Sequence, residues 1–168
     1  MGTWDKGLDL EETLQLLQEK LKMADGAEYT YLAVLVTQAI NGSRVGEALE
    51  AMQKFIDTGE MEQRVKVEKR KDGAERLIIV PSQIERGRLD RGALDLARIK
   101  VYANRKLKIN THSLRYAWIT SQVKKNVNPG IIASITGHKN LNMLIHYIQK
   151  KQGEEYLRQQ TRSFITSF

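Results

Sequence analysis

The chain has 168 residues, a formal net charge of +7 and no cysteine, which predicts a single domain with a real hydrophobic core and excludes disulfides and thiolate metal sites. No apolar run approaches the length of a membrane span, and the acidic N-terminus lacks the pattern of a secretory signal. The basic balance favours polyanionic partners, of which nucleic acid is the foremost.

The first sixty residues carry the signals of three helices. Asp9 is typical of a helix N-cap, and leucines follow it at helical spacing over residues 10–21. A second helix is expected over about 28–40, where an Asn-Gly pair ends it. Ser43 is expected to cap a third helix, which ends near Gly59.

A β-hairpin is expected over residues 63–80. Apolar and basic side chains alternate with charged ones over 65–71, and a short apolar run follows at 77–80. Between them stands Asp72-Gly73, a pair that accepts the positive φ angles of a tight hairpin turn.

The remainder is predicted to be helical with breaks. One helix is expected around 94–102, and Thr111 is expected to cap the next. Asn-Pro-Gly breaks that helix; a short helix then covers 131–136, another covers 141–148, and a polar tail closes the chain. The predicted fold class is therefore α+β, mainly helical, with one small antiparallel β-hairpin.

The last third of the chain holds side chains suited to phosphoryl transfer. Guanidiniums such as those of Arg44 and Arg115 offer forked donor pairs to phosphate oxygens. His112 and His138 are candidates for proton transfer and hydrogen bonding, and the hydroxyl of Tyr147 is a candidate nucleophile. A phosphotyrosine intermediate keeps the energy of the broken bond, so this chemistry needs no ATP, metal or other cofactor.

These residues resemble the catalytic core of the tyrosine recombinases, also called the phage-integrase family. The family carries His-x-x-Arg, then Gly-His, then a nucleophilic Tyr; here these are His112-Ser-Leu-Arg115, Gly137-His138 and Tyr147. The segment 41–47 resembles the family's first arginine motif, an arginine followed three residues later by an acid. The segment 71–76 resembles its lysine-bearing β-hairpin.

The resemblance implies a site-specific DNA recombinase or integrase. Its tyrosine would attack the scissile phosphate to form a 3′-phosphotyrosyl intermediate, followed by strand transfer without metal or ATP. In the family the hairpin lysine protonates the leaving 5′ oxygen, which here would be Lys71. The implied catalytic residues are Arg44, Lys71, His112, Arg115, His138 and Tyr147.

Simpler interpretations of single residues stay open. Lys69 has the same strand parity as Lys71 and competes with it as the general acid. Arg44 can form an ion pair with Glu47 or Glu50 in the helix that it begins, and Tyr147 alone would be typical of an amphipathic core position. A metal site built from the histidines lacks any supporting carboxylate or cysteine spacing.

Double-stranded DNA with a specific attachment site is the implied partner. The hairpin is expected to contact it, and basic residues between 86 and 108 are expected to add phosphate contacts that position DNA without reading its bases. The hairpin residues expected to bind DNA are Lys66, Lys69, Arg70 and Arg76.

Residues 1–168 are expected to form one catalytic domain, with a tail over about 1–8 and a C-terminal tail over 150–168. In the family, a C-terminal segment often docks on a neighbouring protomer, so a homotetramer on DNA is expected. Family members usually also carry an N-terminal helical domain that clamps the far side of the DNA. Nothing before Leu10 could form one, so that core-binding domain is expected to be absent.

The expected nearest relatives are integrases of archaeal spindle-shaped viruses, and the expected place of action is the cytoplasm or nucleoid of a prokaryotic host. Two other functions stay open: a type IB topoisomerase that relaxes supercoils, and a DNA-binding module of this fold without catalysis.

Overall fold

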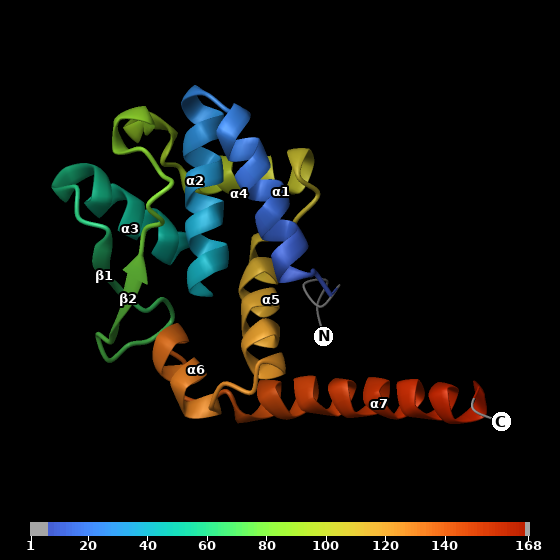
Figure 1. The fold of residues 1–168 in the computed structure, drawn as a ribbon. Helices are drawn as coiled ribbons and strands as arrows, with labels where there is room; N and C mark the ends of the chain where they lie inside the picture. The colour runs from blue at the N-terminus through green and yellow to red at the C-terminus, as the bar shows by residue number, and fades with distance from the viewer. Residues whose placement is uncertain (1–6, 167–168) are drawn as a thin grey trace.

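The computed structural model describes residues 7–166 and confirms the predicted class. Helices form most of this part of the chain, with one antiparallel strand pair at one side (Figure 1). In chain order the elements are α1 (Leu10–Met23), α2 (Gly26–Asn41), α3 (Val45–Thr58), β1 (Glu62–Lys66), β2 (Glu75–Ile79), the 3₁₀ turns η1 (Arg86–Arg88) and η2 (Arg91–Ala93), α4 (Leu96–Lys106), α5 (Thr111–Lys124), α6 (Pro129–Thr136) and α7 (Asn142–Thr166).

The core forms around α2. Most of its side chains are buried, including Leu32 and Leu35, which have no exposed surface. A helix that is apolar nearly all round must be covered on all sides, and α1, α3, α4 and α5 all pack against it. One shared core therefore fixes the relative positions of these helices and of the residues at their ends.

Local signals set the ends of the first helices. The amide of Glu12 donates to Asp9 Oδ1 at 2.9 Å, which confirms the predicted N-cap. The helix α2 ends at Gly42 in the left-handed region, with φ 61°. The predicted cap of α3 was one residue off. Ser43 is buried and its amide closes the end of α2, so Arg44 caps α3, and Glu47 Oε1 accepts the Arg44 amide at 3.0 Å.

The hairpin is present, but its turn differs from the prediction. The strands pair from Glu62 opposite Ile79 to Lys66 opposite Glu75, and residues 67–74 form a longer loop instead of a tight turn at Asp72-Gly73. The backbone of Lys69 lies in the left-handed region with φ 65°, which turns the chain out of the strand. Tertiary contacts of this loop with α3 and α6 override the local preference for a two-residue turn.

Short caps position the segments that follow α4. Asn110 rather than Thr111 caps α5, and its side chain accepts from the amide of His112. Asn128 caps α6 with Pro129 in the first turn, and α6 ends at Gly137 with φ 80°, as predicted.

The C-terminal region corrects the prediction. The predicted polar tail after Ile148 is instead a continuation of α7, which runs to Thr166. Ile145 and Ile148 anchor its first half, whereas side chains 153–164 are exposed and the helix projects from the body (Figure 1). Good helix formers and i,i+3 or i,i+4 ion pairs from Arg158 to two glutamates support this exposed stretch.

The tail predicted for about residues 1–8 lies mostly outside the described residues, as does Phe168 at the other end. Between residues 7 and 166, no helix combines the length and the apolar character needed to cross a membrane.

Candidate active site

A cavity of about 670 Å³ lies where α3, the hairpin loop, α5, α6 and α7 meet. Five of the six predicted catalytic residues line it, although they come from segments far apart in the sequence. That they catalyse a reaction stays a prediction, but their convergence is observed. The lining residues are Arg44, Lys69, His112, Arg115, Tyr116, Ile119, His138, Met143, Leu144 and Tyr147.

Arg115 forms the floor of this cavity. It is only 2% exposed, and its Nη1 donates to the Gly42 carbonyl at 3.4 Å while its Nη2 donates to the Thr136 carbonyl at 3.4 Å. Burial and the neighbouring Arg44 lower the pKa of Arg115 to about 10, so it still carries its charge at neutral pH. The side chain is thus held in one orientation before any ligand arrives.

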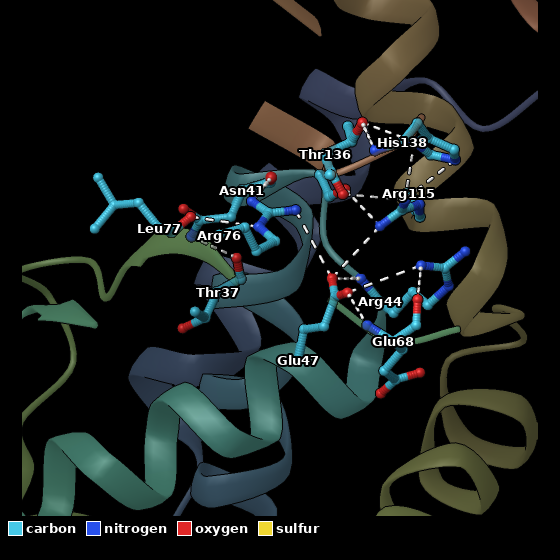
Figure 2. Close-up of polar contacts among 12 residues, drawn as sticks. Thr37, Asn41, Arg44, Glu47, Glu68, Arg76, Leu77, Arg115, Thr136 and His138 are labelled. Atoms are coloured by element: carbon cyan, nitrogen blue, oxygen red, sulfur yellow. Dashed lines mark hydrogen bonds and ion pairs between the residues drawn. The ribbon is translucent and has the colours of Figure 1, made fainter. Parts of the chain in front are cut away.

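One buried carboxylate holds the arginines together. Glu47 has no exposed surface, and its Oε1 lies 3.5 Å from Arg115 Nη1 and 3.8 Å from Arg76 Nη1. Its Oε2 lies 3.8 Å from Arg44 Nη1 and accepts the Glu68 amide at 3.0 Å. Figure 2 shows these contacts meeting at Glu47. Three guanidiniums therefore share one negative charge, which leaves a positive excess that an anionic ligand would offset.

Arg44 belongs to this cluster and also faces the cavity. The predicted ion pair with Glu47 is present, so both interpretations of this residue describe the structure. Its Nη1 also donates to the Glu68 carbonyl at 3.2 Å, which ties the start of the hairpin loop to α3. Sequence reasoning treated Glu47 only as a partner for Arg44; an acid three residues after an arginine was the available signal, but nothing local showed that Arg76 and Arg115 share it.

His138 lies against Arg115. Its Nε2 is 3.2 Å from Arg115 Nη2, and its Nδ1 is 2.7 Å from the Thr136 hydroxyl. Burial, followed by the charge of Arg115, lowers the pKa of His138 to about 3. The ring is therefore neutral at physiological pH, as it must be because a guanidinium can only donate and the contacted nitrogen must accept.

His112 lies at the start of α5, one turn before Arg115, and its side chain is exposed. Burial of part of the ring lowers its pKa, and the charges of Arg115, Arg44 and Lys69 act in the same direction. A neutral imidazole at the rim of the cavity can accept a proton.

Tyr147 reaches the cavity from the first half of α7. It is half-buried, and it packs against the apolar cluster of α5 and α7. The ammonium of Lys151, one turn further along the helix, lies 4.6 Å from the centre of its ring. This placement combines the amphipathic core position expected for a lone tyrosine with access to the cavity.

The hairpin lysines exchange their expected places. Lys69 lines the cavity beside His112, whereas Lys71 lies at the exposed tip of the loop and is not part of the lining. The longer loop is the reason, because Lys71 no longer stands beside a tight two-residue turn, the position that had favoured it over Lys69.

The predicted DNA contacts of the hairpin divide into two groups. Lys66 and Lys69 are exposed, and Arg70 pairs with Asp72 and donates to the Gly137 carbonyl at 3.1 Å. The interpretation of Arg76 as a DNA contact does not agree with its position. Arg76 is 2% exposed and donates to the Asn41 carbonyl at 2.7 Å (Figure 2). Its guanidinium is buried beside Glu47 and stabilises the arginine cluster from inside the protein.

Three basic residues of the 86–108 segment bind protein groups. Arg86 donates to the Ile56 carbonyl at the end of α3, Arg88 donates to the Ala24 carbonyl after α1, and Arg91 pairs with Asp57. They fasten η1 and η2 to the helix ends, and the phosphate contacts expected of this segment stay a prediction. Within the part of the chain that the structure describes, no cluster of histidine and acidic side chains could hold a metal ion.

Comparison with known proteins identifies relatives from archaeal systems. No protein-family model matches the chain. It is 37% identical over 167 residues to "Putative integrase ORF241" of Acidianus two-tailed virus, a match that covers 94% of this chain and 68% of the viral protein. It is 31% identical over 197 aligned positions to "Uncharacterized protein MJ0770" of Methanocaldococcus jannaschii, covering 94% of this chain and 88% of that protein. The chain therefore belongs to the protein family that includes this protein of Acidianus two-tailed virus.

Proposed function

We propose that this chain is a DNA integrase of the tyrosine recombinase class, which cuts and rejoins DNA through a phosphotyrosine at Tyr147. One observation carries the proposal: five residues of the expected catalytic set, from separate segments of the chain, line a single cavity. The kinship with the viral protein named "Putative integrase ORF241" supports the same reaction class.

In this proposal Arg44 and Arg115 hold the nonbridging oxygens of the scissile phosphate. Glu47 fixes both guanidiniums before DNA binds, so little reorganisation is needed when charge develops in the transition state. The positive excess of the cluster is the physical reason that an anion is attracted to this cavity.

The Tyr147 hydroxyl then attacks phosphorus. A bond forms between the phenol oxygen and phosphorus, the bond to the 5′ oxygen breaks, and the strand keeps its 3′ phosphate on the tyrosine. His112, neutral at physiological pH, accepts the phenol proton. A lysine of the hairpin loop donates a proton to the leaving oxygen; Lys71 has the motif position, but Lys69 lines the cavity, which favours Lys69.

The proposed substrate is duplex DNA with a specific attachment site, bound by a homotetramer. Exposed Leu157 and Phe164 on the projecting half of α7 support a contact between protomers. Truncation after Lys151 should abolish DNA-dependent assembly in light scattering while the helical content of the remaining body is kept. Unchanged assembly would refute this role of α7.

Trapping on a nicked suicide duplex tests the reaction. A library of such duplexes with random sequence yields the preferred site when covalently bound DNA is recovered and sequenced. The wild-type chain should form the adduct, and Tyr147→Phe should form none. An adduct that persists in Tyr147→Phe would refute the assignment of the nucleophile.

Assays on the same protein preparation distinguish the two alternative functions. Relaxation of supercoiled plasmid without a preferred site would indicate a type IB topoisomerase. Binding to the duplex without any adduct would indicate a DNA-binding module that lacks catalysis.

The general acid is tested with a 5′-bridging sulfur at the cleavage site, because a thiolate leaves without a proton. Adduct formation by Lys69→Ala should be slow on normal DNA and restored on the sulfur-containing duplex. If Lys71→Ala were instead the variant that is slow on normal DNA and restored on the sulfur-containing duplex, Lys71 would be the proton donor.

A further inference from the structure

A second hollow, of about 370 Å³, adjoins the active-site cavity on the side of α4. Arg44, Lys69 and His112 line both hollows and so stand between them. Tyr147 lines only the first hollow, and Lys100 of α4 lines only the second. The two spaces therefore share Arg44, one of the two arginines proposed to hold the phosphate, whereas Arg115 lines only the first.

The second hollow contains a buried polar atom without a partner. Gln38 is 1% exposed and its Nε2 donates to the Thr111 carbonyl at 2.8 Å, but among the described residues nothing donates to its Oε1. Buried amide oxygens are normally satisfied. This oxygen has almost no accessible surface, so a ligand in the hollow would reach it only if the Gln38 side chain moved.

The charge of the hollow favours an anionic ligand. Arg44, Lys69 and Lys100 face it, against the single carboxylate of Glu68. Amide side chains of Asn104 and Asn110 complete the lining with neutral donors and acceptors. This combination of cations and amides is typical of sites that hold a phosphate and a sugar.

The geometry of phosphoryl transfer fixes where the leaving oxygen lies relative to the attacking tyrosine. Attacking and leaving oxygens lie roughly in line on opposite sides of phosphorus. In the proposed reaction the leaving oxygen lies within reach of Lys69, which donates its proton and lines both hollows. We propose that the second hollow holds the 5′-terminal nucleotide of the leaving strand, with Lys100 on its next phosphate. This inference rests on the proposed function and names a strand-holding site within it.

Such a site acts mainly when the strand is rejoined. In that step the 5′ oxygen attacks phosphorus and the proton of its hydroxyl returns to the hairpin lysine, while the phenol oxygen leaves and regains its proton from His112. A strand that stays in the hollow is positioned for this attack. Loss of Lys100 should therefore weaken binding of the incoming strand more than it slows the chemical step.

The test uses wild-type adduct formed on the selected suicide duplex and a short complementary oligonucleotide with a 5′ hydroxyl. The rejoining rate is measured against oligonucleotide concentration. Lys100→Met should raise the concentration for half-maximal rejoining about tenfold, with the maximal rate changed less than about twofold. Asn104→Ala should raise it about threefold. The salt dependence of Lys100→Met should fall by about 0.7 in log–log slope, the value for one phosphate on a single strand.

Lys106→Met is the matched comparator, because Lys106 is exposed on the same helix but lies outside the hollow. General attraction to DNA would make the two lysine variants behave alike, which would overturn the inference, as would an unchanged half-maximal concentration in Lys100→Met. Absence of any Tyr147-dependent adduct in the wild type would instead refute the proposed function itself.

Discussion

The Glu47 cluster and the outer half of α7 use charged residues in opposite ways. In the cluster, the fully buried carboxylate of Glu47 contacts three arginines from separate segments of the chain. Arg44 caps α3, Arg76 lies in β2 and Arg115 lies in α5. In the outer half of α7, Arg158 pairs at the surface with glutamates of its own helix. Burial makes the first set costly to disturb, whereas solvent screens the second.

The difference separates two tasks along one chain. The cluster fixes the groups that would contact the reacting phosphate, so changes in it should affect both stability and catalysis. The outer half of α7 leaves the body of the protein and should affect assembly while the cavity stays intact. Four substitutions or measurements test this division, from the largest expected effect to the smallest.

Replacement of Glu47 should have the largest effect on stability. In Glu47→Gln the cluster loses the carboxylate that contacts all three guanidiniums and leaves buried guanidiniums unpaired, which typically costs about 3–5 kcal/mol. Urea unfolding followed by far-UV circular dichroism measures this loss. Glu50→Gln is the matched control, since Glu50 lies on the same helix but pairs with Lys54 at the surface; a similar loss in both variants would contradict the role of burial.

Replacement of Arg115 by lysine should separate catalysis from folding. The ammonium keeps the charge but loses the forked donors, so adduct formation should fall by about 10²–10³. The free energy of unfolding should fall less than in Glu47→Gln, because the positive charge facing Glu47 remains. Single-turnover kinetics on the suicide duplex measure the first effect, and a rate within about threefold of wild type would argue against the phosphate clamp.

The cluster should also make the body sensitive to acid. The pKa of His138 is about 3 in the folded chain, against an ordinary value of 6.5 when unfolded. Below pH 6.5 the unfolded chain therefore binds a proton that the folded chain resists, and stability falls as the pH drops toward 3. One such histidine contributes at most about 1.4 kcal/mol per pH unit.

This contribution is measured as a difference. Urea unfolding of wild type and His138→Asn at a series of pH values between 7 and 4 should show a shallower decline in the variant. Identical slopes would mean that His138 titrates normally in the folded protein.

Replacement of Gly153 should have the smallest effect, because this residue lies in α7 and outside the Glu47 cluster. It lies inside α7 where the buried half ends, and an added Cβ would meet no atom within 4 Å. Gly153→Ala should stabilise the helix locally by about 1 kcal/mol because alanine has the higher helix propensity. Hydrogen exchange should slow around residue 153, with adduct formation and urea unfolding of the body unchanged; a change in adduct formation would show that α7 and the cavity are coupled.

Sequence reasoning found most of the elements, because caps and periodicity act over a few residues. Asp9, Gly42, Gly59 and Gly137 mark helix ends where they were expected. Errors of one residue at Ser43 and Thr111 arose because neighbouring residues competed for the same cap. The C-terminal half of α7 was missed because it has no apolar stripe that continues the pattern of its first half.

The sequence by itself determined the fold class, the hairpin and the residue types suited to a phosphate, since each depends on local spacing or side-chain chemistry. Only the tertiary structure decided that Arg76 turns inward to Glu47, that Lys69 rather than Lys71 faces the cavity, and that five distant side chains meet there. The physical reason is that burial and charge pairing depend on which remote segments pack together. A buried carboxylate selects its arginines by position in space, and no local pattern encodes that choice.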